Sequence, residues 1–400
     1  MSSSVVEVSS GVHWVGVRHP DLQFFDELFP THNGTTYNSY LVRGQEKTVL
    51  IDSVKEKFTD EFFANIEQIL PVASIDAIVV NHTEPDHSGA LGRLVELNPA
   101  MVIYCSRPAA NFLKQLLHKP LNIEVVEDGQ EIDLGGKTLR IISAPFLHWP
   151  DTIMTYLVED HILFSCDAFG AHYCPNGSLF DDQIADFSSD FHAYFDCIMR
   201  PFKDKIREAL SRLEGLEISM VCPSHGPIRR LTHFDAIHAY RRWSALPPEG
   251  EKPKAVLAVL SSHGNTRHMG DVIRHTLEER GFDVQEFALC GMRDDDFRDA
   301  LEQADVVLFG SPTIQRDAPP HIWHALALLS TVTLKTRVAA VFGSFGWSGE
   351  AAGMIEARLA GLKFKLAAET LTCRFTPTEE VFEASRLFAA QIADTVLVKG

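Results

Sequence analysis

The sequence predicts an α/β protein of two domains, of which the second is a doubly wound parallel sheet. The chain has 400 residues, more than one ordinary hydrophobic core supports. A stretch rich in proline, glycine and charge, residues 246–253, shows no periodicity and predicts a boundary. After this stretch, apolar runs and helical patterns alternate strictly, as they do in a doubly wound sheet. We therefore expect one domain over residues 1–248 and another over residues 249–400.

The composition is that of a globular protein, with 45% hydrophobic and 22% charged residues. A formal net charge of −18 argues against a nucleic-acid partner. No run of about 18 apolar residues occurs, and the first residues lack the features of a signal peptide, so we expect no membrane association. The seven cysteines form no C-x-x-C pair, which argues against a disulfide framework and a rubredoxin-type iron site. We expect free thiols and a cytoplasmic protein.

Short apolar runs bounded by turn residues predict many strands in the first domain, with helices between the later ones. The expected strands cover residues 12–17, 36–42, 48–52, 75–80, 101–105, 139–143, 155–158, 161–165 and 219–222. The expected helices cover residues 62–70, 90–97, 109–117, 191–213 and 234–244, the fourth of them broken at Pro201.

The second domain is expected to contain five strands and five helices in alternation. The strands cover residues 255–260, 283–289, 305–309, 337–342 and 365–371. Four helices begin near Thr266, Asp295, Pro320 and Gly349, and the last covers residues 379–396.

Two imidazoles and two carboxylates lie within six residues directly after the strand 75–80. They are His82, Glu84, Asp86 and His87, and we expect them on a loop. Groups crowded this closely would repel one another or lose hydration at a cost unless cations gathered them. Three further ligand-type residues, His148, Asp167 and His225, stand just past other strand ends. All seven are expected at one edge of the domain, as strand-end loops of one sheet would be.

Seven such residues suit two metal ions bridged by one carboxylate, and Asp167, alone after its strand, is the natural bridge. Side chains alternate sides along an extended loop, so His82 and Glu84 would reach one metal while Asp86 and His87 reach the other. Open positions would remain for a bridging oxygen and a substrate. No role is assigned to the other histidines, among them His19 and His172.

The order H-x-E-x-D-H, followed by single His, Asp and His residues, resembles the metallo-β-lactamase fold as flavodiiron proteins use it. These are the A-type flavoproteins, rubredoxin:oxygen oxidoreductases and nitric oxide reductases. The resemblance implies an αββα sandwich with His82, Glu84 and His148 on the iron nearer the flavin. It implies Asp86, His87 and His225 on the distal iron, with the counterpart of His87 turned away in some members. Hydrolases of this fold usually have a histidine where Glu84 stands, and an oxygen ligand suits iron better than zinc.

Three loops at strand ends in the second domain predict a flavin site. Ser261, Ser262, His263, Gly264, Asn265 and Thr266 open a helix, where hydroxyls and backbone N–H groups bind phosphate. The loop lacks G-x-G-x-x-G, which favours a mononucleotide over a dinucleotide. The two other loops resemble those of the flavodoxin module of flavodiiron proteins, which implies FMN. Their candidate contacts are Pro312, Thr313, Ile314, Gln315, Ser344, Phe345, Gly346, Trp347 and Gly349.

A redox cofactor beside two metals indicates electron delivery rather than hydrolysis. The resemblance implies reduction of dioxygen to water, of nitric oxide to nitrous oxide, or both, in a head-to-tail homodimer or a dimer of such dimers. The donor would be a rubredoxin, a flavoprotein reductase or reduced deazaflavin. Phe25 lies where many members carry a Phe-His pair and Tyr194 where a Tyr-Tyr pair is common, so both are candidates to line the pocket.

Two other functions are compatible with the same residues. One is a zinc hydrolase of the metallo-β-lactamase fold whose flavodoxin-like module binds a partner. The other, more distant, is a flavin-binding redox sensor without catalysis. Metal and flavin content would discriminate among the three.

Overall fold

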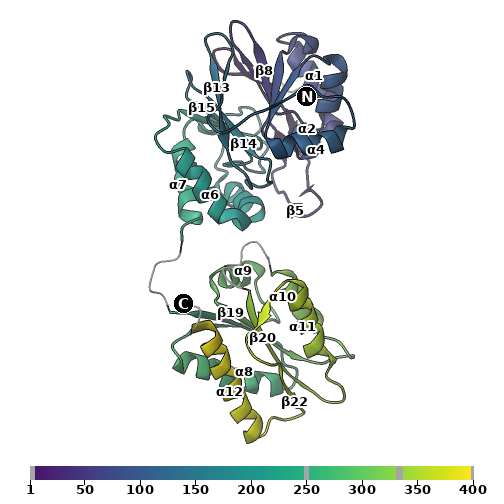
Figure 1. Ribbon diagram of the computed structural model, residues 1–400, viewed down its shortest axis with the longest axis vertical. Coiled ribbons are helices and arrows are strands. Elements are labelled where there is room, and N and C mark those ends of the chain that lie inside the picture. Colours follow the sequence, from purple (N-terminus) through teal and green to yellow (C-terminus); the bar gives the residue numbers. More distant parts are fainter. Residues whose placement is uncertain (1–4, 247–251, 330–336, 398–400) are drawn as a thin grey trace. The chain divides into compact units, whose positions relative to one another are not determined.

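The computed structural model describes residues 5–246, 252–329 and 337–397, and the chain forms two compact units (Figure 1). The first unit extends to Ala245 and the second begins at Leu246. The boundary expected between residues 248 and 249 lies outside the described residues. Among the described residues, no helix is both long and apolar enough to cross a membrane.

The first unit is a sandwich of two sheets with helices on both outer faces. The seven-stranded sheet has the order β1-β2-β7-β8-β9-β10-β11 and the five-stranded sheet the order β12-β13-β14-β15-β16. Their bounds are Val6–Ser9, Val12–Trp14, Tyr40–Arg43, Thr48–Ile51, Ala77–Val80, Val102–Cys105 and Ile123–Val125, then Glu131–Asp133, Thr138–Ser143, Ile153–Leu157, Ile162–Cys166 and Met220–Pro223. Side chains of both sheets, such as Trp14 and Phe164, share one core between them.

Helices cover the two outer faces of this sandwich. Those on the seven-stranded sheet are α1 (Thr59–Glu67), α3 (Leu91–Leu97) and α4 (Arg107–Leu117). Those on the five-stranded sheet are α5 (Ser188–Tyr194), α6 (Lys203–Arg212) and α7 (His233–Trp243). Two separate cores result, one under each helical layer, in addition to the core between the sheets.

Two strands expected near the N-terminus are interrupted in the structure. The run 12–17 breaks at Gly16, where a Cβ atom would lie 2.2 Å from the Tyr37 carbonyl oxygen. The run 36–42 breaks at Asn38, whose side-chain amide donates to Pro223 O (2.8 Å) and Gly226 O (2.9 Å). The resulting pieces β3 (Val17–His19) and β6 (Thr35–Tyr37) pair with each other outside the large sheets.

Two further expectations for this unit need correction. The loop after β9 contains a single helical turn, α2 (Pro85–Ser88), because proline at the first helical position is pre-organised for a helix. The helix expected over residues 191–213 is four pieces, with a π-helical turn, Phe195–Met199, and a 3-10 turn, Arg200–Phe202, between α5 and α6. Pro201 cannot donate a backbone hydrogen bond, which accounts for the break there.

The second unit is a parallel sheet with the order β18-β17-β19-β20-β21 and with β22 also beside β20. The strands β17 to β22 are Lys254–Val259, Asp283–Ala288, Val306–Pro312, Val338–Phe345, Lys365–Leu366 and Leu371–Arg374. The strand expected over residues 365–371 is therefore two short strands, because the four residues 367–370 lie opposite only residues 340–341 of β20.

Helices cover both faces of this sheet. On one face lie α8 (Asn265–Glu279) and α12 (Glu379–Leu397). On the other lie α9 (Asp294–Gln303), α10 (Pro320–Ala327) and α11 (Glu350–Gly361). The expected doubly wound architecture is confirmed, and it brings the ends of β17, β19 and β20 to one edge.

Candidate metal centre and cofactor site

The seven ligand-type residues of the first unit lie together, but they come from both sheets. His82, Glu84, Asp86 and His87 follow β9 of the seven-stranded sheet. The other three flank strands of the five-stranded sheet: His148 precedes β14, Asp167 follows β15 and His225 follows β16. The expectation that they stand at the edge of one sheet is therefore wrong. A sandwich brings strand ends of two facing sheets to the same side, which one sheet alone would not do.

These side chains form two groups with hydrogen-bonding distances inside each. In the first group, Glu84 Oε2 lies 3.1 Å from both His82 Nε2 and His148 Nε2. In the second group, His225 Nε2 lies 3.1 Å from Asp86 Oδ2, and His87 Nε2 lies 3.4 Å from Asp86 Oδ1. Within each group the ligand-type atoms all lie within 4.8 Å of one another.

Asp167 lies between the two groups and offers one carboxylate oxygen to each. Its Oδ2 atom is 3.9 Å from His82 Nε2 and 3.8 Å from His148 Nε2. Its Oδ1 atom is 3.2 Å from His87 Nε2 and 3.4 Å from His225 Nε2. This is the position that a carboxylate bridging two cations would need.

The division between the groups has a different local cause from the one expected. Asp86 and His87 were predicted to diverge from Glu84 along an extended loop, but both belong to the helical turn α2. Successive residues of a helix are about 100° apart, so neighbouring side chains can approach one group together. His82 and Glu84 precede the turn and lie in the other group.

The charges of these side chains are poorly compensated by protein atoms alone. Both carboxylate oxygens of Asp86 and Nε2 of His87 are buried without a hydrogen-bond partner of good geometry among the described residues. Burial lowers the pKa of His82, but hydrogen bonds with Asp151 and Glu84 raise it to about 9. Burial opposes ionisation of Asp167 too, yet His87 and His82 hold its pKa well below the usual range. Such a donor set fits divalent cations, which would satisfy the unpaired oxygens.

The second unit contains a cavity of about 440 Å³, within the size range of small-molecule sites. Three strand-end loops line it, and most of the predicted contacts are among the lining residues: Ser261, Ser262, His263, Asn265, Pro312, Thr313, Ile314, Gln315, Ser344, Phe345, Gly346 and Trp347. Arg316, Ser348 and Phe375 line it as well and were not predicted. Phe375 follows the short strand β22, which the sequence pattern did not separate from its neighbour.

Three predicted contacts support the cavity without lining it. Gly264 turns the chain into α8 with φ +87°, a conformation that favours glycine. The Thr266 hydroxyl lies 2.8 Å from the Ser344 hydroxyl and ties two of the loops together. Gly349 lies against the ring of Phe345, where a Cβ atom would approach to 2.9 Å.

Comparisons with known proteins match both units. Residues 35–226 match the family described as ODP family beta lactamase, and residues 258–388 match flavodoxin. The chain is 39% identical to the type A flavoprotein of Rhodobacter capsulatus, over 97% of this chain and 91% of that protein. It is 34% identical to a flavo-diiron protein of Clostridium acetobutylicum, over 98% and 99% of the two chains. The chain belongs to the flavodiiron protein family.

Other flavodiiron proteins have names that state a reaction. A nitric oxide reductase of Moorella thermoacetica is 37% identical over 98% of this chain and 100% of its own. The solved rubredoxin oxygen:oxidoreductase of Desulfovibrio gigas is 27% identical, with a TM-score of 0.71 over 99% of both chains. The predicted fold class and family are thus confirmed, and the chain is an oxidoreductase. The zinc hydrolase with a partner-binding module is not favoured.

Two buried carboxylates that hold the metal-site loops were missed in the sequence. Asp151 Oδ2 lies 3.3 Å from His82 Nδ1 and accepts hydrogen bonds from the backbone N–H and hydroxyl of Thr83. Asp52 accepts from the backbone N–H of Asn81 at 2.7 Å, and burial raises its pKa to about 6. Asp52 directly follows β8 in the structure, as Asp167 follows β15, but the expected strand 48–52 had included it. Asp151 carries no such signal.

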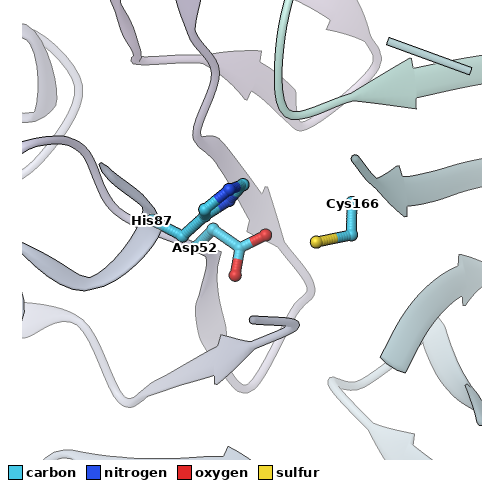
Figure 2. Close-up of side chains that lie close together, drawn as sticks. All are labelled: Asp52, His87 and Cys166. Carbon is cyan, nitrogen blue, oxygen red and sulfur yellow. The ribbon is translucent and has the colours of Figure 1, made fainter. Parts of the chain in front are cut away.

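Figure 2 shows the side chains of Asp52, His87 and Cys166, which lie close together. Their ligand-type atoms lie within 4.8 Å of one another. Cys166 Sγ is also 3.8 Å from Asp167 Oδ2. Because burial raises the pKa of the Cys166 thiol well above its usual range, the group stays neutral.

Phe25 and Tyr194, the two candidates for the pocket wall, both contact the metal-site residues. The Tyr194 hydroxyl donates to Asp167 Oδ1 at 3.1 Å. The Phe25 ring lies 4.2 Å from the ring of His172 and 5.4 Å from that of His225. Phe25 belongs to the hairpin β4 (Phe24–Phe25) and β5 (Phe29–Pro30), which the sequence analysis did not predict.

Proposed function

We propose that the protein carries electrons from an external donor to dioxygen, nitric oxide or both, using FMN and a pair of iron ions. The products would be water and nitrous oxide. The observation that supports this most strongly is the placement of Asp167, which offers one oxygen to each of two His-carboxylate groups. The names of the relatives from Moorella and Desulfovibrio favour the same pair of substrates.

The residues of the two groups would hold one iron each. His82, Glu84 and His148 supply the first, Asp86, His87 and His225 the second, and Asp167 joins them. Glu84 is the reason to choose iron over zinc, since a hard oxygen donor stands where hydrolases of this fold have a nitrogen. When bound, the two irons supply coordination and reduction of a small oxidant.

The protein's own contribution at this site is orientation and exclusion of water. Asp151 fixes the ring of His82 through Nδ1, and the carbonyl oxygen of Thr36 accepts from Nδ1 of His225 at 2.8 Å. Both rings then present Nε2 to the site. Phe25 and Tyr194 pack over the second group, so bulk solvent is kept from that side.

The cavity of the second unit would hold FMN, which stores two electrons and passes them on. Its phosphate would lie at the N-terminus of α8, where the backbone N–H groups after Gly264 are unpaired by the helix itself. Phe345, Trp347 and Phe375 supply aromatic surface for the ring system. The side chain of Trp347 is 91% exposed in the isolated chain, so a partner is expected to cover it.

A head-to-tail homodimer, or a dimer of such dimers, would provide that cover. Phe24 and Leu28, in and beside the hairpin of Phe25, and Phe146, two residues before His148, are exposed by 58%, 71% and 42%. Two domains of about 250 and 150 residues have radii of gyration near roughly 18 and 15 Å, so strand-end sites in one chain are expected to lie tens of ångströms apart. Apposing the flavin of one copy to the metals of another shortens the electron path.

The donor and the compartment complete the proposal. The name of the Desulfovibrio relative, rubredoxin oxygen:oxidoreductase, favours a separate donor such as a rubredoxin, with a flavoprotein reductase or reduced deazaflavin as the other candidates. None of the seven cysteines, all of them among the described residues, is in a disulfide, as suits a reducing cytoplasm.

The test is an electrode assay of dioxygen and nitric oxide consumption with chemically reduced rubredoxin as donor. Protein with about two irons and one FMN per chain is expected to consume at least one gas, and an Asp167→Ala variant is expected to lose that activity. Consumption of neither gas by fully loaded protein would refute the proposal. Two zinc ions per chain together with esterase or lactonase activity would instead establish the hydrolase.

A further inference from the structure

Three polar side chains form a hydrogen-bonded line from the surface of the first unit towards the metal-site residues. Lys57 Nζ lies 3.1 Å from His19 Nε2, and His19 Nδ1 lies 3.4 Å from the Tyr37 hydroxyl. Exposure falls along the line: Lys57 is exposed, His19 is partly buried and Tyr37 is 1% exposed. The line therefore connects solvent with the interior.

The direction of each hydrogen bond follows from the chemistry of the groups. A lysine ammonium only donates, so His19 Nε2 must accept. The proton of the neutral imidazole is then on Nδ1, and it is donated to the Tyr37 oxygen. This leaves the Tyr37 hydroxyl proton free to be donated onwards.

Strand pairing explains why His19 and Tyr37 meet. In the pair β3–β6, His19 is opposite Thr35 and Val17 is opposite Tyr37. His19 and Tyr37 are therefore diagonal neighbours on one face, within reach of long side chains. The ring of His19 also packs edge-on against Phe58, with 5.1 Å between centroids.

The inner end of the line lies beside the second metal-site group. The Tyr37 ring meets the His225 ring edge-on, with 5.8 Å between centroids. The neighbouring Thr36 carbonyl binds His225 Nδ1, so β6 holds both residues in register with the site.

The charges around His19 keep its ring neutral. Burial, Lys57 and Lys55 lower its pKa to about 4, against a smaller opposing effect of Asp21. A neutral imidazole accepts at one nitrogen and donates at the other, which a protonated ring cannot do. The other hydrogen-bonding partner of the His19 ring is the Tyr37 hydroxyl.

We propose that Lys57, His19 and Tyr37 form a proton relay that supplies the metal site. The inference rests on the proposed function, because reduction of dioxygen or nitric oxide consumes protons. In one transfer, a proton moves from Lys57 Nζ to His19 Nε2, the Nδ1 proton moves to the Tyr37 oxygen, and the original hydroxyl proton leaves Tyr37 for the reduction at the metal site, which consumes it. Lys57 then takes a proton from solvent. The partly exposed His19 ring gives its Nε2 proton to solvent and takes another at Nδ1 from solvent, which restores its first tautomer. No electrons move along the relay.

The test compares His19→Ala and Tyr37→Phe with two matched controls in the iron- and FMN-loaded full chain. The controls are His275→Ala, an exposed histidine of α8, and Tyr104→Phe, a buried tyrosine of β10 whose hydroxyl makes no hydrogen bond within the part of the chain that the structure describes. Each relay variant is expected to lose turnover by about tenfold or more, somewhat below the roughly 100-fold or greater loss typical of removing a general acid or base. The controls should stay within about twofold of the parent chain.

Two measurements separate proton transfer from a structural role. Added imidazole should restore the turnover of His19→Ala. It should leave the turnover of both controls unchanged. In the zinc-loaded full chain, ¹⁵N NMR with labelled histidine should report the Nδ1–H tautomer for His19, a readout that does not depend on activity. An Nε2–H tautomer, or parental turnover in both relay variants, would overturn the relay.

Failure of the relay and failure of the proposed function give different results. If the parent chain consumes neither gas, the proposed function fails, whatever the variants do. If the parent chain is active and His19→Ala loses turnover that imidazole does not restore, the function stands and the relay is refuted.

Discussion

Asp151 Oδ2 lies 3.3 Å from His82 Nδ1, and both side chains are completely buried. The same oxygen accepts from the Thr83 backbone N–H (2.8 Å) and hydroxyl (2.7 Å). Burial works against ionisation of Asp151, but its bonds with His82 and Thr83 lower its pKa. A carboxylate in this position fixes the tautomer of a metal-binding histidine and makes Nε2 the better ligand.

Replacing Asp151 by asparagine is expected to weaken metal binding without unfolding the sandwich. Outer partners of this kind contribute about 10- to 100-fold to metal affinity. The measurement is a chelator competition that yields the iron affinity of Asp151→Asn and of the parent chain. Asp60→Asn is the control, since Asp60 belongs to an exposed ion pair with Arg93. Equal affinities in Asp151→Asn and Asp60→Asn would contradict the role given to Asp151.

Removing the metals is expected to destabilise the first unit and spare the second. Glu84, Asp86 and Asp167 are close together and largely buried, so their charges repel once no cation is present. A ligand at about 100 times its dissociation constant stabilises the folded state by about 2.7 kcal/mol. Calorimetry of the metal-loaded and chelator-treated protein should show a lower melting temperature for the first unit. The melting temperature of the second unit, which depends on FMN, should not change. A common shift of both transitions would be evidence against separate units.

Gly264→Ala is expected to weaken FMN binding through the backbone alone. A Cβ atom there would meet nothing closer than the His268 ring at 3.5 Å, but φ is +87°. Placing a side chain in that region costs about 1–2 kcal/mol, so affinity should fall roughly 5- to 30-fold. Fluorescence titration of the apoprotein with FMN measures this affinity. Gly353→Ala in α11 is the control, because open space surrounds that position and alanine favours the helix. Unchanged affinity in Gly264→Ala would show that the loop relaxes.

Asp181→Asn is expected to destabilise the first unit by about 1–3 kcal/mol at neutral pH. Asp181 accepts hydrogen bonds from the backbone N–H groups of Arg230, Leu231 and Thr232 and from the Thr232 hydroxyl. Burial opposes the charge, but these donors lower its pKa below 3.8. A lowered pKa means that the stabilisation is present above about pH 3.8 and is lost as the pH falls through the folded-state value.

Urea unfolding at several pH values checks this sign. The difference in the free energy of unfolding between Asp181→Asn and the parent chain should be largest near neutral pH and should shrink in acid. Asp182→Asn is the matched control, since the neighbouring Asp182 makes a more exposed pair with Arg230. A difference that grows on acidification would contradict the assignment.

Much of the second unit followed from local pattern. Its strands and helices alternate with periods that any short window of sequence displays, and the loops after β17, β19 and β20 were identified from composition. The exception is instructive. The run 365–371 has the composition of one strand, yet pairing with β20 occurs only at its two ends. Phe375 was missed as a cavity residue for that reason.

In the first unit the sequence alone determined which side chains stand at strand ends: His82 to His87, His148, Asp167 and His225. Their chemical types and order, with Glu84 among them, were enough to indicate two metals and the family. Such signals are local, because they need only the end of an apolar run and the residues that follow it.

Only the tertiary structure decided how those residues meet. The two sheets face each other, so Asp167 gives one oxygen to each group, and a remote carboxylate, Asp151, reaches His82. The pairing of β3 with β6 places His19, an unremarked histidine in the sequence, against Tyr37. Contacts of this kind join residues far apart in the chain. They depend on strand register and on the packing of one sheet against another, which no local periodicity encodes.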